Sequence, residues 1–167
     1  METKYDENEI RKEYNELTKT LIEKGYTVAT MESATAGQIA SLFTDTEGSS
    51  AVFKGGWIAY TNEAKVMEGI PKHLIDTYGV YSEEVANAMA NLCRRGFETN
   101  IGIGVTGTMG NVDPANPDCS EPGIVYFSID INGSVVSHRI ELSHQPSRLM
   151  YKLAVAKEIV GRITERL

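Results

Sequence analysis

Two short runs of the sequence carry residues that could perform nucleophilic catalysis. Ser33 lies in the run Glu-Ser-Ala-Thr-Ala-Gly over residues 32–37, directly after a β-type segment, and Lys65 ends the run Tyr-Thr-Asn-Glu-Ala-Lys over residues 60–65. A lysine can act as the general base for a serine when desolvation or a neighbouring positive charge lowers its pKa. Spacing alone favours a solvent-exposed helix lysine at position 65, so a Ser-Lys pair is one of two interpretations.

The histidines offer a weaker alternative base for Ser33. His73, His138 and His144 fall in a short helix, a hairpin and a loop, and none has an Asp or Ser in a recognisable pattern beside it. A Ser-His-Asp triad is therefore not indicated by the sequence. Lys65 is the better candidate.

Hydroxyl and glycine residues follow two of the expected strands. Thr35 and Gly37 precede a helix, and Thr106 and Gly107 follow a strand of alternating isoleucine and glycine. Backbone N–H groups in such turns, with help from a helix dipole, can receive an anion. Each turn alone is weak evidence, since glycines after strands commonly serve tight turns. Together they predict a phosphate or oxyanion cradle at one edge of a sheet.

Helices and strands must position these residues. The spacing of hydrophobic residues along the chain predicts the order of these helices and strands. Asn62 is expected to cap the helix that carries Lys65. Asn132-Gly133-Ser134 is a strong hairpin signal. Interleaved helices and strands followed by a hairpin predict a three-layer α/β/α sandwich with a mixed sheet, with ligands at the strand ends. The sequence predicts helices at 6–24, 36–44, 63–67, 71–79, 82–97 and 146–167, and strands at 27–31, 51–60, 101–105, 124–131 and 135–142.

Residues 111–122 interrupt this pattern with three prolines and three acids, so they form a long loop. A lid over a site and ordinary surface decoration are both consistent with its length. Met89 and Cys93, on the apolar stripe of the helix at 82–97, are predicted to be core residues.

Composition narrows the class of protein. The 167 residues are enough for one well-cored domain, and 41% hydrophobic with 23% charged residues is typical of a globular chain. A net charge of −7 argues against nucleic-acid binding, because that affinity depends on Lys and Arg neutralising phosphates. Cys93 and Cys119 belong to no metal or disulfide pattern, so no metal site is expected. The sequence has no apolar run of the length of a signal peptide or a membrane-spanning helix, so we expect a cytoplasmic protein that binds no membrane. The sequence leaves the oligomeric state open, and a homo-oligomer is possible.

The motifs together resemble the C-terminal domain family of CinA, whose characterised members are nicotinamide mononucleotide (NMN) amidohydrolases. Residues 32–37 resemble the family's E-S-C-T-G-G, and residues 60–65 resemble its Y-S-N-E-A-K. Residues 80–86 resemble G-A-V-S-E-E-V-A, residues 106–110 resemble S-G-I-A-G, and residues 122–125 resemble P-V-G-T-V less one residue. The resemblance runs in order from Thr27 to the final helix.

The resemblance implies a fold, an activity and a set of roles. It implies a stand-alone version of that domain, without the molybdopterin-binding-like domain of longer relatives, and a sandwich like that of anticodon-binding domains. The activity implied is hydrolysis of the NMN carboxamide to nicotinate mononucleotide and ammonia, with no metal or cofactor. Ser33 would be the nucleophile, Lys65 its base and Tyr60 a helper in the proton network. Substrate-binding roles would fall to Thr35, Gly37, Ser50, Thr106, Gly107 and Arg148.

Several positions depart from the family pattern. Ala34 replaces the usual Cys, Ala36 replaces the first Gly of the pair, and Asn111 stands where the family has Pro. Arg148 is the nearest match to the family's ligand-binding arginine, displaced in register. These departures leave two alternatives to NMN hydrolysis: a nucleotide- or phosphate-binding module without turnover, and an amidase for another small amide.

Overall fold

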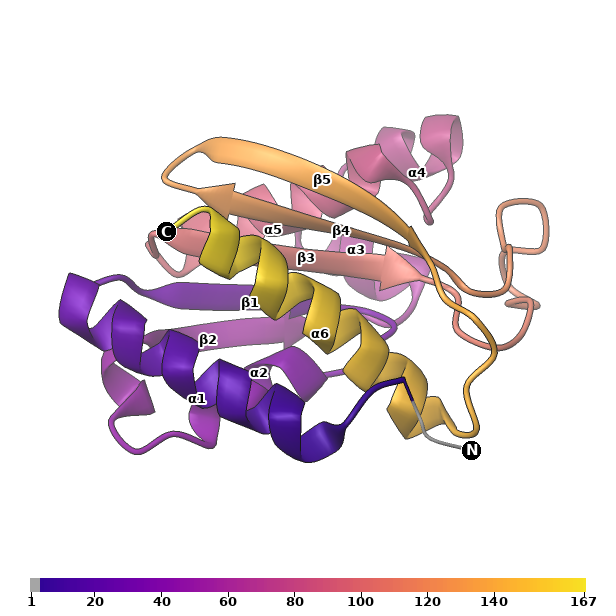
Figure 1. The fold of residues 1–167 in the computed structure, drawn as a ribbon. Helices are drawn as coiled ribbons and strands as arrows, with labels where there is room; N and C mark the ends of the chain where they lie inside the picture. Colours follow the sequence, from indigo (N-terminus) through magenta and orange to yellow (C-terminus); the bar gives the residue numbers. More distant parts are fainter. Residues whose placement is uncertain (1–3) are drawn as a thin grey trace.

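The computed structural model describes residues 4–167 and is built on one five-stranded sheet in the order β2-β1-β3-β4-β5 (Figure 1). β1 (Val28–Glu32) pairs in parallel with β2 (Phe53–Ile58) and with β3 (Ile101–Gly107). β4 (Ile124–Ile131) and β5 (Ser134–Glu141) complete the sheet in antiparallel fashion. The predicted mixed sheet and its C-terminal hairpin are confirmed.

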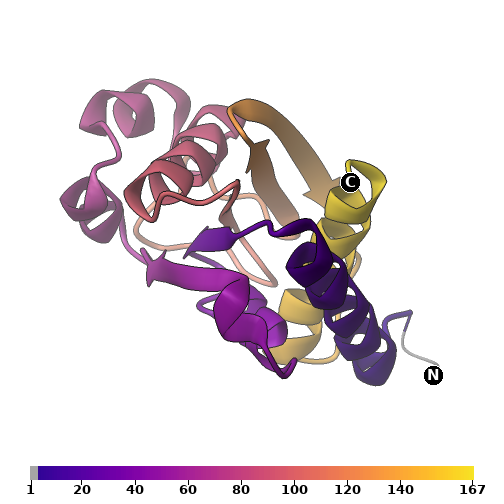
Figure 2. The ribbon, with the colours of Figure 1, turned by 90° about the vertical axis from the view of Figure 1, so that its left-hand side faces the viewer.

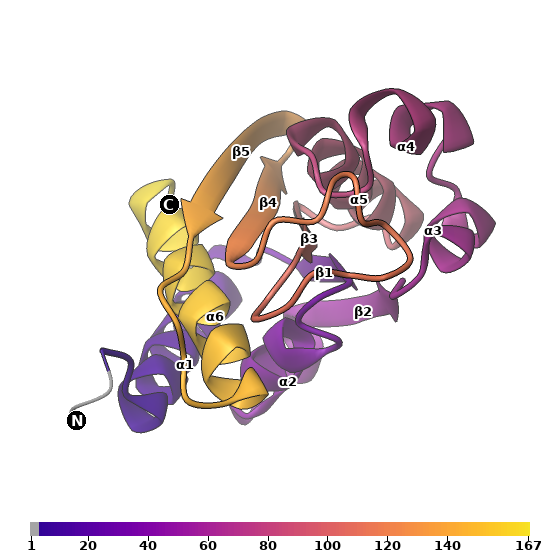
Figure 3. The same ribbon diagram turned by 90° about the vertical axis from the view of Figure 1, so that its right-hand side faces the viewer.

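Helices cover both faces of the sheet (Figures 2 and 3). One layer holds α1 (Glu7–Lys24), α2 (Gln38–Thr44) and α6 (Arg148–Glu165). The other holds α3 (Asn62–Glu68), α4 (Lys72–Tyr78) and α5 (Glu83–Gly96). A short 3-10 helix, η1 (Ser49–Ala51), precedes β2. The predicted α/β fold with three layers is confirmed, and Met89 and Cys93 are core residues, as expected.

β3 shows why isoleucine and glycine alternate in this strand. Ile101 and Ile103 belong to the core beneath α1 and α6. On the other face a Cβ at Gly102 would lie 2.1 Å from the carbonyl oxygen of Ala90, and one at Gly104 would lie 2.5 Å from that of Ala86. The glycines therefore let α5 lie directly on the strand, which brings that layer close to the sheet.

Two differences from the predictions fall beside the candidate site, at the end of β2 and at the start of α3. β2 ends at Ile58, so Tyr60 lies beyond the strand. Thr61 caps α3 by accepting a hydrogen bond from the backbone N–H of Ala64 at 3.0 Å, and Asn62 is the first residue of that helix. A threonine hydroxyl can serve as a helix cap as an asparagine does, and here it leaves the Asn62 side chain for other contacts.

The carboxyl ends of β1, β2 and β3 meet at one edge of the sheet, seen from the front in Figure 3. After β1 the chain turns to α2 on one face, whereas the connection from β2 to β3 runs through the helices of the other face. In an open α/β sheet such a reversal leaves a crevice beside the strand ends. In the part of the chain from residue 4 onward, no helix is long and apolar enough to cross a membrane.

Candidate active site

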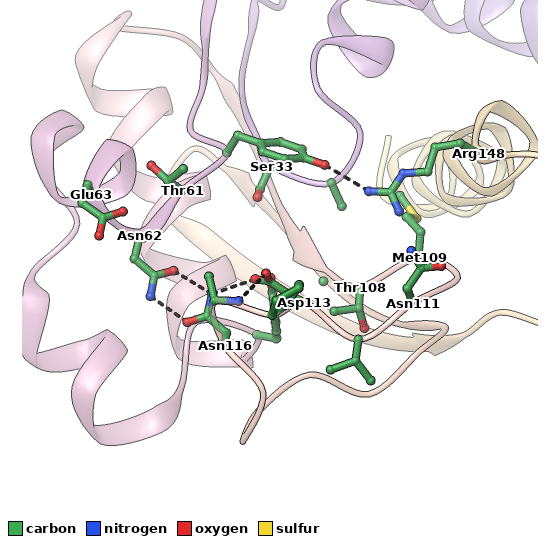
Figure 4. A pocket seen from close by; sticks show the side chains of 17 residues that line it. Ser33, Thr61, Asn62, Glu63, Thr108, Met109, Asn111, Asp113, Asn116 and Arg148 are labelled. Atoms are coloured by element: carbon green, nitrogen blue, oxygen red, sulfur yellow. Dashed lines mark hydrogen bonds between the residues drawn. The ribbon is translucent and has the colours of Figure 1, made fainter.

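A pocket of about 340 Å³ lies at this edge of the sheet (Figure 4). Its walls come from the turn after β1, the segment after β2, the segment after β3 and the first turn of α6. Its volume falls within the range of about 300–1,000 Å³ that is typical of small-molecule sites. The strand-end location expected from the sequence therefore does hold a pocket.

Ser33 lines this pocket and lies in hydrogen-bond contact with the buried Lys65. The Ser33 backbone N–H donates to the carbonyl oxygen of Val105 at 3.0 Å, which fixes the residue at the end of β1. Lys65 Nζ lies 3.1 Å from Ser33 Oγ and donates to the carbonyl oxygen of Ala59 at 2.9 Å. The structure thus brings the two residues into hydrogen-bond contact, although they lie far apart in the sequence.

Burial gives Lys65 its unusual acidity. Only 1% of the residue is exposed, so the interpretation of a solvent-exposed lysine is wrong. Desolvation disfavours the charged form and lowers the pKa of Lys65 from 10.5 to about 8, while the charge of Asp113 acts in the opposite direction. About a tenth of the molecules therefore hold a neutral amine at pH 7. A neutral amine 3.1 Å from a serine hydroxyl can act as its general base.

The turn between β1 and α2 does not form the expected anion cradle. The carboxylate of Glu32 accepts hydrogen bonds from the backbone N–H groups of Ile39 and Ala40, at 2.9 and 3.1 Å, and from the hydroxyl of Thr35 at 2.7 Å. The N-terminus of α2 is already occupied by a carboxylate of the same chain. Thr35 and Gly37 are absent from the pocket lining. The structure therefore does not support the prediction that these two residues contact the substrate.

The turn after β3 contributes one of its two predicted residues. Gly107 lines the pocket, and a Cβ there would lie 2.6 Å from the Cα of Val125 on the neighbouring strand. Thr106 is buried and donates its hydroxyl to the carbonyl oxygen of Val80 at 2.9 Å. Thr106 therefore anchors the segment before α5. Its hydroxyl is used in this contact, which corrects the prediction that Thr106 binds the ligand.

Ser50 lies at the opposite edge of the sheet. It belongs to η1, which precedes β2, whereas the pocket lies beyond the end of that strand. Six residues of strand separate the two places, roughly 20 Å at about 3.3 Å per residue. The expectation that Ser50 holds phosphate or the oxyanion is therefore corrected.

Tyr60 and Arg148 line the pocket together. Arg148 begins α6 and donates from Nη2 to the Tyr60 hydroxyl at 3.1 Å, the contact drawn beside Arg148 in Figure 4. No hydrogen bond within residues 4–167 joins the Tyr60 hydroxyl to Ser33 or Lys65. Tyr60 is thus placed to hold an arginine at the pocket rim, and its predicted part in the proton network stays a prediction.

The loop at 111–122 supplies residues that the sequence reasoning did not select. Asp113 accepts hydrogen bonds from the Tyr81 hydroxyl at 2.5 Å and from Asn116 Nδ2 at 2.8 Å. Asn116 and Asn62 exchange side-chain hydrogen bonds of 2.7 and 3.2 Å, which tie the loop to α3 (Figure 4). The spacing Asp-Pro-Ala-Asn signals a local turn, but nothing local in the sequence indicates the partners Tyr81 and Asn62.

The two alanines that replace family residues occupy the turn after Ser33. Ala34 lines the pocket and also belongs to the core. Ala36 has φ +46°, in the left-handed region that costs an L-residue about 1–2 kcal/mol. A glycine at position 36 would carry no such cost, so this chain holds strain beside its candidate nucleophile.

Neither a metal site nor a disulfide accompanies this pocket in the described part of the chain. Residues 4–167 contain no cluster of three or more His, Cys, Asp or Glu that could hold a metal ion. Cys93 and Cys119 are both free. Burial raises the pKa of the Cys93 thiol to about 12, so this cysteine is not a reactive thiolate.

Comparisons with known proteins show which family the chain matches and which solved structures share its fold. The family model described as the CinA C-terminal domain matches residues 11–160. A CinA-like protein of Gemmatimonas aurantiaca is 39% identical over 133 residues, which are 77% of this chain and 30% of that protein. The chain therefore spans less than a third of the length of this relative.

Two solved structures share the fold. The competence/damage inducible protein of Agrobacterium tumefaciens is 28% identical with a TM-score of 0.83, over 93% of this chain and 94% of that one. A CinA superfamily protein of Escherichia coli has a TM-score of 0.87 at 20% identity, over 99% of this chain and 95% of that one. The second likeness shows the fold alone.

Lys65→Met should stabilise the protein by up to about 3 kcal/mol at pH 7, because methionine removes the cost of burying an ammonium group. Between about pH 8 and 10.5 the unfolded chain holds the lysine proton and the folded chain does not, so wild type gains stability as the pH rises. The advantage of the variant should therefore shrink across that interval in urea unfolding experiments. Lys72→Met, at a 74% exposed side chain, should shift stability by less than about 0.5 kcal/mol. Lower stability of Lys65→Met at pH 7 would contradict the account.

Ala36→Gly should raise stability by about 0.5 kcal/mol, since relief of the left-handed strain outweighs the larger entropy loss of glycine. Ala40→Gly, inside α2, should instead cost about 1 kcal/mol. Thermal unfolding of both variants measures the contrast. Equal losses at the two positions would show that Ala36 is not strained.

Proposed function

The chain belongs to the CinA C-terminal domain family, and from that premise we propose that it is an amidohydrolase that converts NMN to nicotinate mononucleotide and ammonia. One observation carries the proposal: the buried Lys65 Nζ lies 3.1 Å from Ser33 Oγ, and its pKa is lowered to about 8. A structural lysine would normally be exposed or paired with a carboxylate. A buried amine beside a pocket serine is one arrangement that can activate a serine.

The reaction proceeds in two balanced halves. Neutral Lys65 takes the proton from Ser33 Oγ, and the oxygen attacks the carboxamide carbon to give a tetrahedral intermediate. The C–N bond breaks as Lys65 returns the proton to the departing nitrogen, which releases ammonia and leaves an ester on Ser33. Water then attacks the ester with Lys65 as the base, and the Ser33 hydroxyl regains the proton as the carboxylate product leaves.

The turn after Ser33 supports stabilisation of the oxyanion. Ala34 follows the nucleophile and lines the pocket. Within residues 4–167 no hydrogen bond uses its backbone N–H. An N–H directly after a nucleophile is a common oxyanion donor, and its fixed position costs no reorganisation during the reaction. This donor takes the part that the resemblance assigns to amides nearer Gly37.

Arg148 supports recognition of the phosphate. Its guanidinium reaches the pocket from the first turn of an 18-residue helix, and the Tyr60 hydroxyl holds it at 3.1 Å. A guanidinium can bind phosphate oxygens with two parallel hydrogen bonds, and the N-terminus of a helix adds positive potential. The proposed arrangement places the carboxamide at Ser33 and the phosphate near Arg148.

Ammonia release from NMN by purified protein tests the proposal. Ser33→Ala and Lys65→Ala should each lower kcat by at least about a thousandfold, because a nucleophile and its base act as a unit. Matched controls are Ser50→Ala and Lys54→Ala, which change the same residue types at the opposite edge of the sheet. Both controls should retain activity within about twofold.

Other outcomes separate the alternatives. Equal ammonia release by wild type and both pocket variants would refute the assigned roles. Calorimetric binding of NMN without any release would favour a binding module, and release only from other amides would favour a different substrate.

A further inference from the structure

Asp113 presents a negative charge to the pocket, where Lys65 is near enough to interact with that charge although the two form no salt bridge. Its carboxylate accepts from the Tyr81 hydroxyl, from Asn116 Nδ2 and from the backbone N–H of Ala115, at 2.5, 2.8 and 3.0 Å. All three donors are neutral, and no salt bridge involves Asp113 within residues 4–167. Hydrogen bonds from Asn116 and Tyr81 hold its pKa below the ordinary value, so the group is ionised at neutral pH.

This charge opposes the chemistry proposed for the pocket. Asp113 favours the protonated form of Lys65, which cannot act as a base. A neutral asparagine could fill the same volume and would not hinder the loss of a proton from Lys65. The carboxylate is therefore a cost to the empty site, and a cation in the bound substrate would offset it.

Three charged side chains line the pocket, the carboxylates of Glu63 and Asp113 and the guanidinium of Arg148. Asp113 comes from the loop after β3, and Arg148 comes from α6 (Figure 4). Ser33 lines the same pocket. Such a distribution suits a ligand with a positive group at one end and a negative group at the other.

We propose that Asp113 is the counter-ion for a cationic ring in the substrate, so that the pocket selects amides borne on a positively charged heterocycle with an anionic group at its far end. The pyridinium carboxamide of NMN has this charge pattern, and the inference rests on the function proposed above. A cation bound beside Asp113 also removes the influence of the carboxylate from Lys65. Asp113 is thus a specificity-determining residue, and Tyr81 and Asn116 position it.

A ring-neutral isostere of NMN, the 5′-phosphate of benzamide riboside, isolates the ring charge. Wild type should show kcat/KM for NMN at least about tenfold above that for the isostere. Asp113→Asn should lower the NMN value by about tenfold and change the isostere value by less than about threefold. Asp118→Asn, the same substitution on an exposed residue of the same loop, should change neither value.

Tyr81→Phe separates charge from loop structure, because it removes a hydrogen bond to Asp113 and keeps the carboxylate. It should shift both substrates by the same factor. Equal losses on both substrates in Asp113→Asn would overturn the inference and leave the amidohydrolase proposal intact.

Calorimetry with Ser33→Ala tests the inference independently of turnover. NMN should bind at least about tenfold more tightly than the isostere, and adding Asp113→Asn should abolish that preference. This result would support the role of Asp113 even if wild type released no ammonia. The absence of ammonia release would contradict only the proposed function. Equal affinities for the two ligands, or no binding of either, would overturn the inference.

Discussion

The burial of the Lys65 ammonium group is the constraint on which the rest of the site depends. Its Nζ atom has two hydrogen-bond partners, Ser33 Oγ and the carbonyl oxygen of Ala59, and neither is a carboxylate. An amine held this way gives up its proton more easily, and the folded protein is less stable for carrying it. Both partners are fixed by the sheet, since Ser33 donates to Val105 and Ala59 donates to Glu32, each through its backbone N–H.

Negative charge is distributed so that the Glu32 carboxylate is kept inside the protein, whereas the carboxylates of Asp113 and Glu63 line the pocket. Glu32 fills the N-terminus of α2 and is 1% exposed, so that helix offers nothing to a substrate. Asp113 holds its charge at the pocket through neutral donors, opposite the guanidinium of Arg148. The hydroxyl-rich turn after β1 is therefore held together by Glu32, whereas the loop after β3 presents Asp113 to the pocket.

Local patterns predicted most of the fold and part of the site. Alternation in β3, the Asn-Gly turn after β4 and the stripe of α5 are properties of neighbouring residues, so the sequence was enough to place them. The strand-end rule also placed Ser33 and Gly107 at one edge. Ser50 and Thr106 were misplaced because a motif position does not say which end of a strand a residue occupies or where its hydroxyl points. The loop at 111–122 depends on distant partners, since Tyr81 lies 32 residues from Asp113 and Asn62 lies 54 residues from Asn116, and no local pattern encodes these contacts.

The central claim, that Lys65 is an amine of lowered pKa beside the nucleophile, can be measured directly. An NMR titration of the lysine side chains in ¹³C,¹⁵N-labelled protein would follow each Cε resonance, with Lys65 assigned from its loss in Lys65→Met. The account predicts one lysine with a midpoint at about pH 8. A Lys65 midpoint near the ordinary value of 10.5 would contradict it.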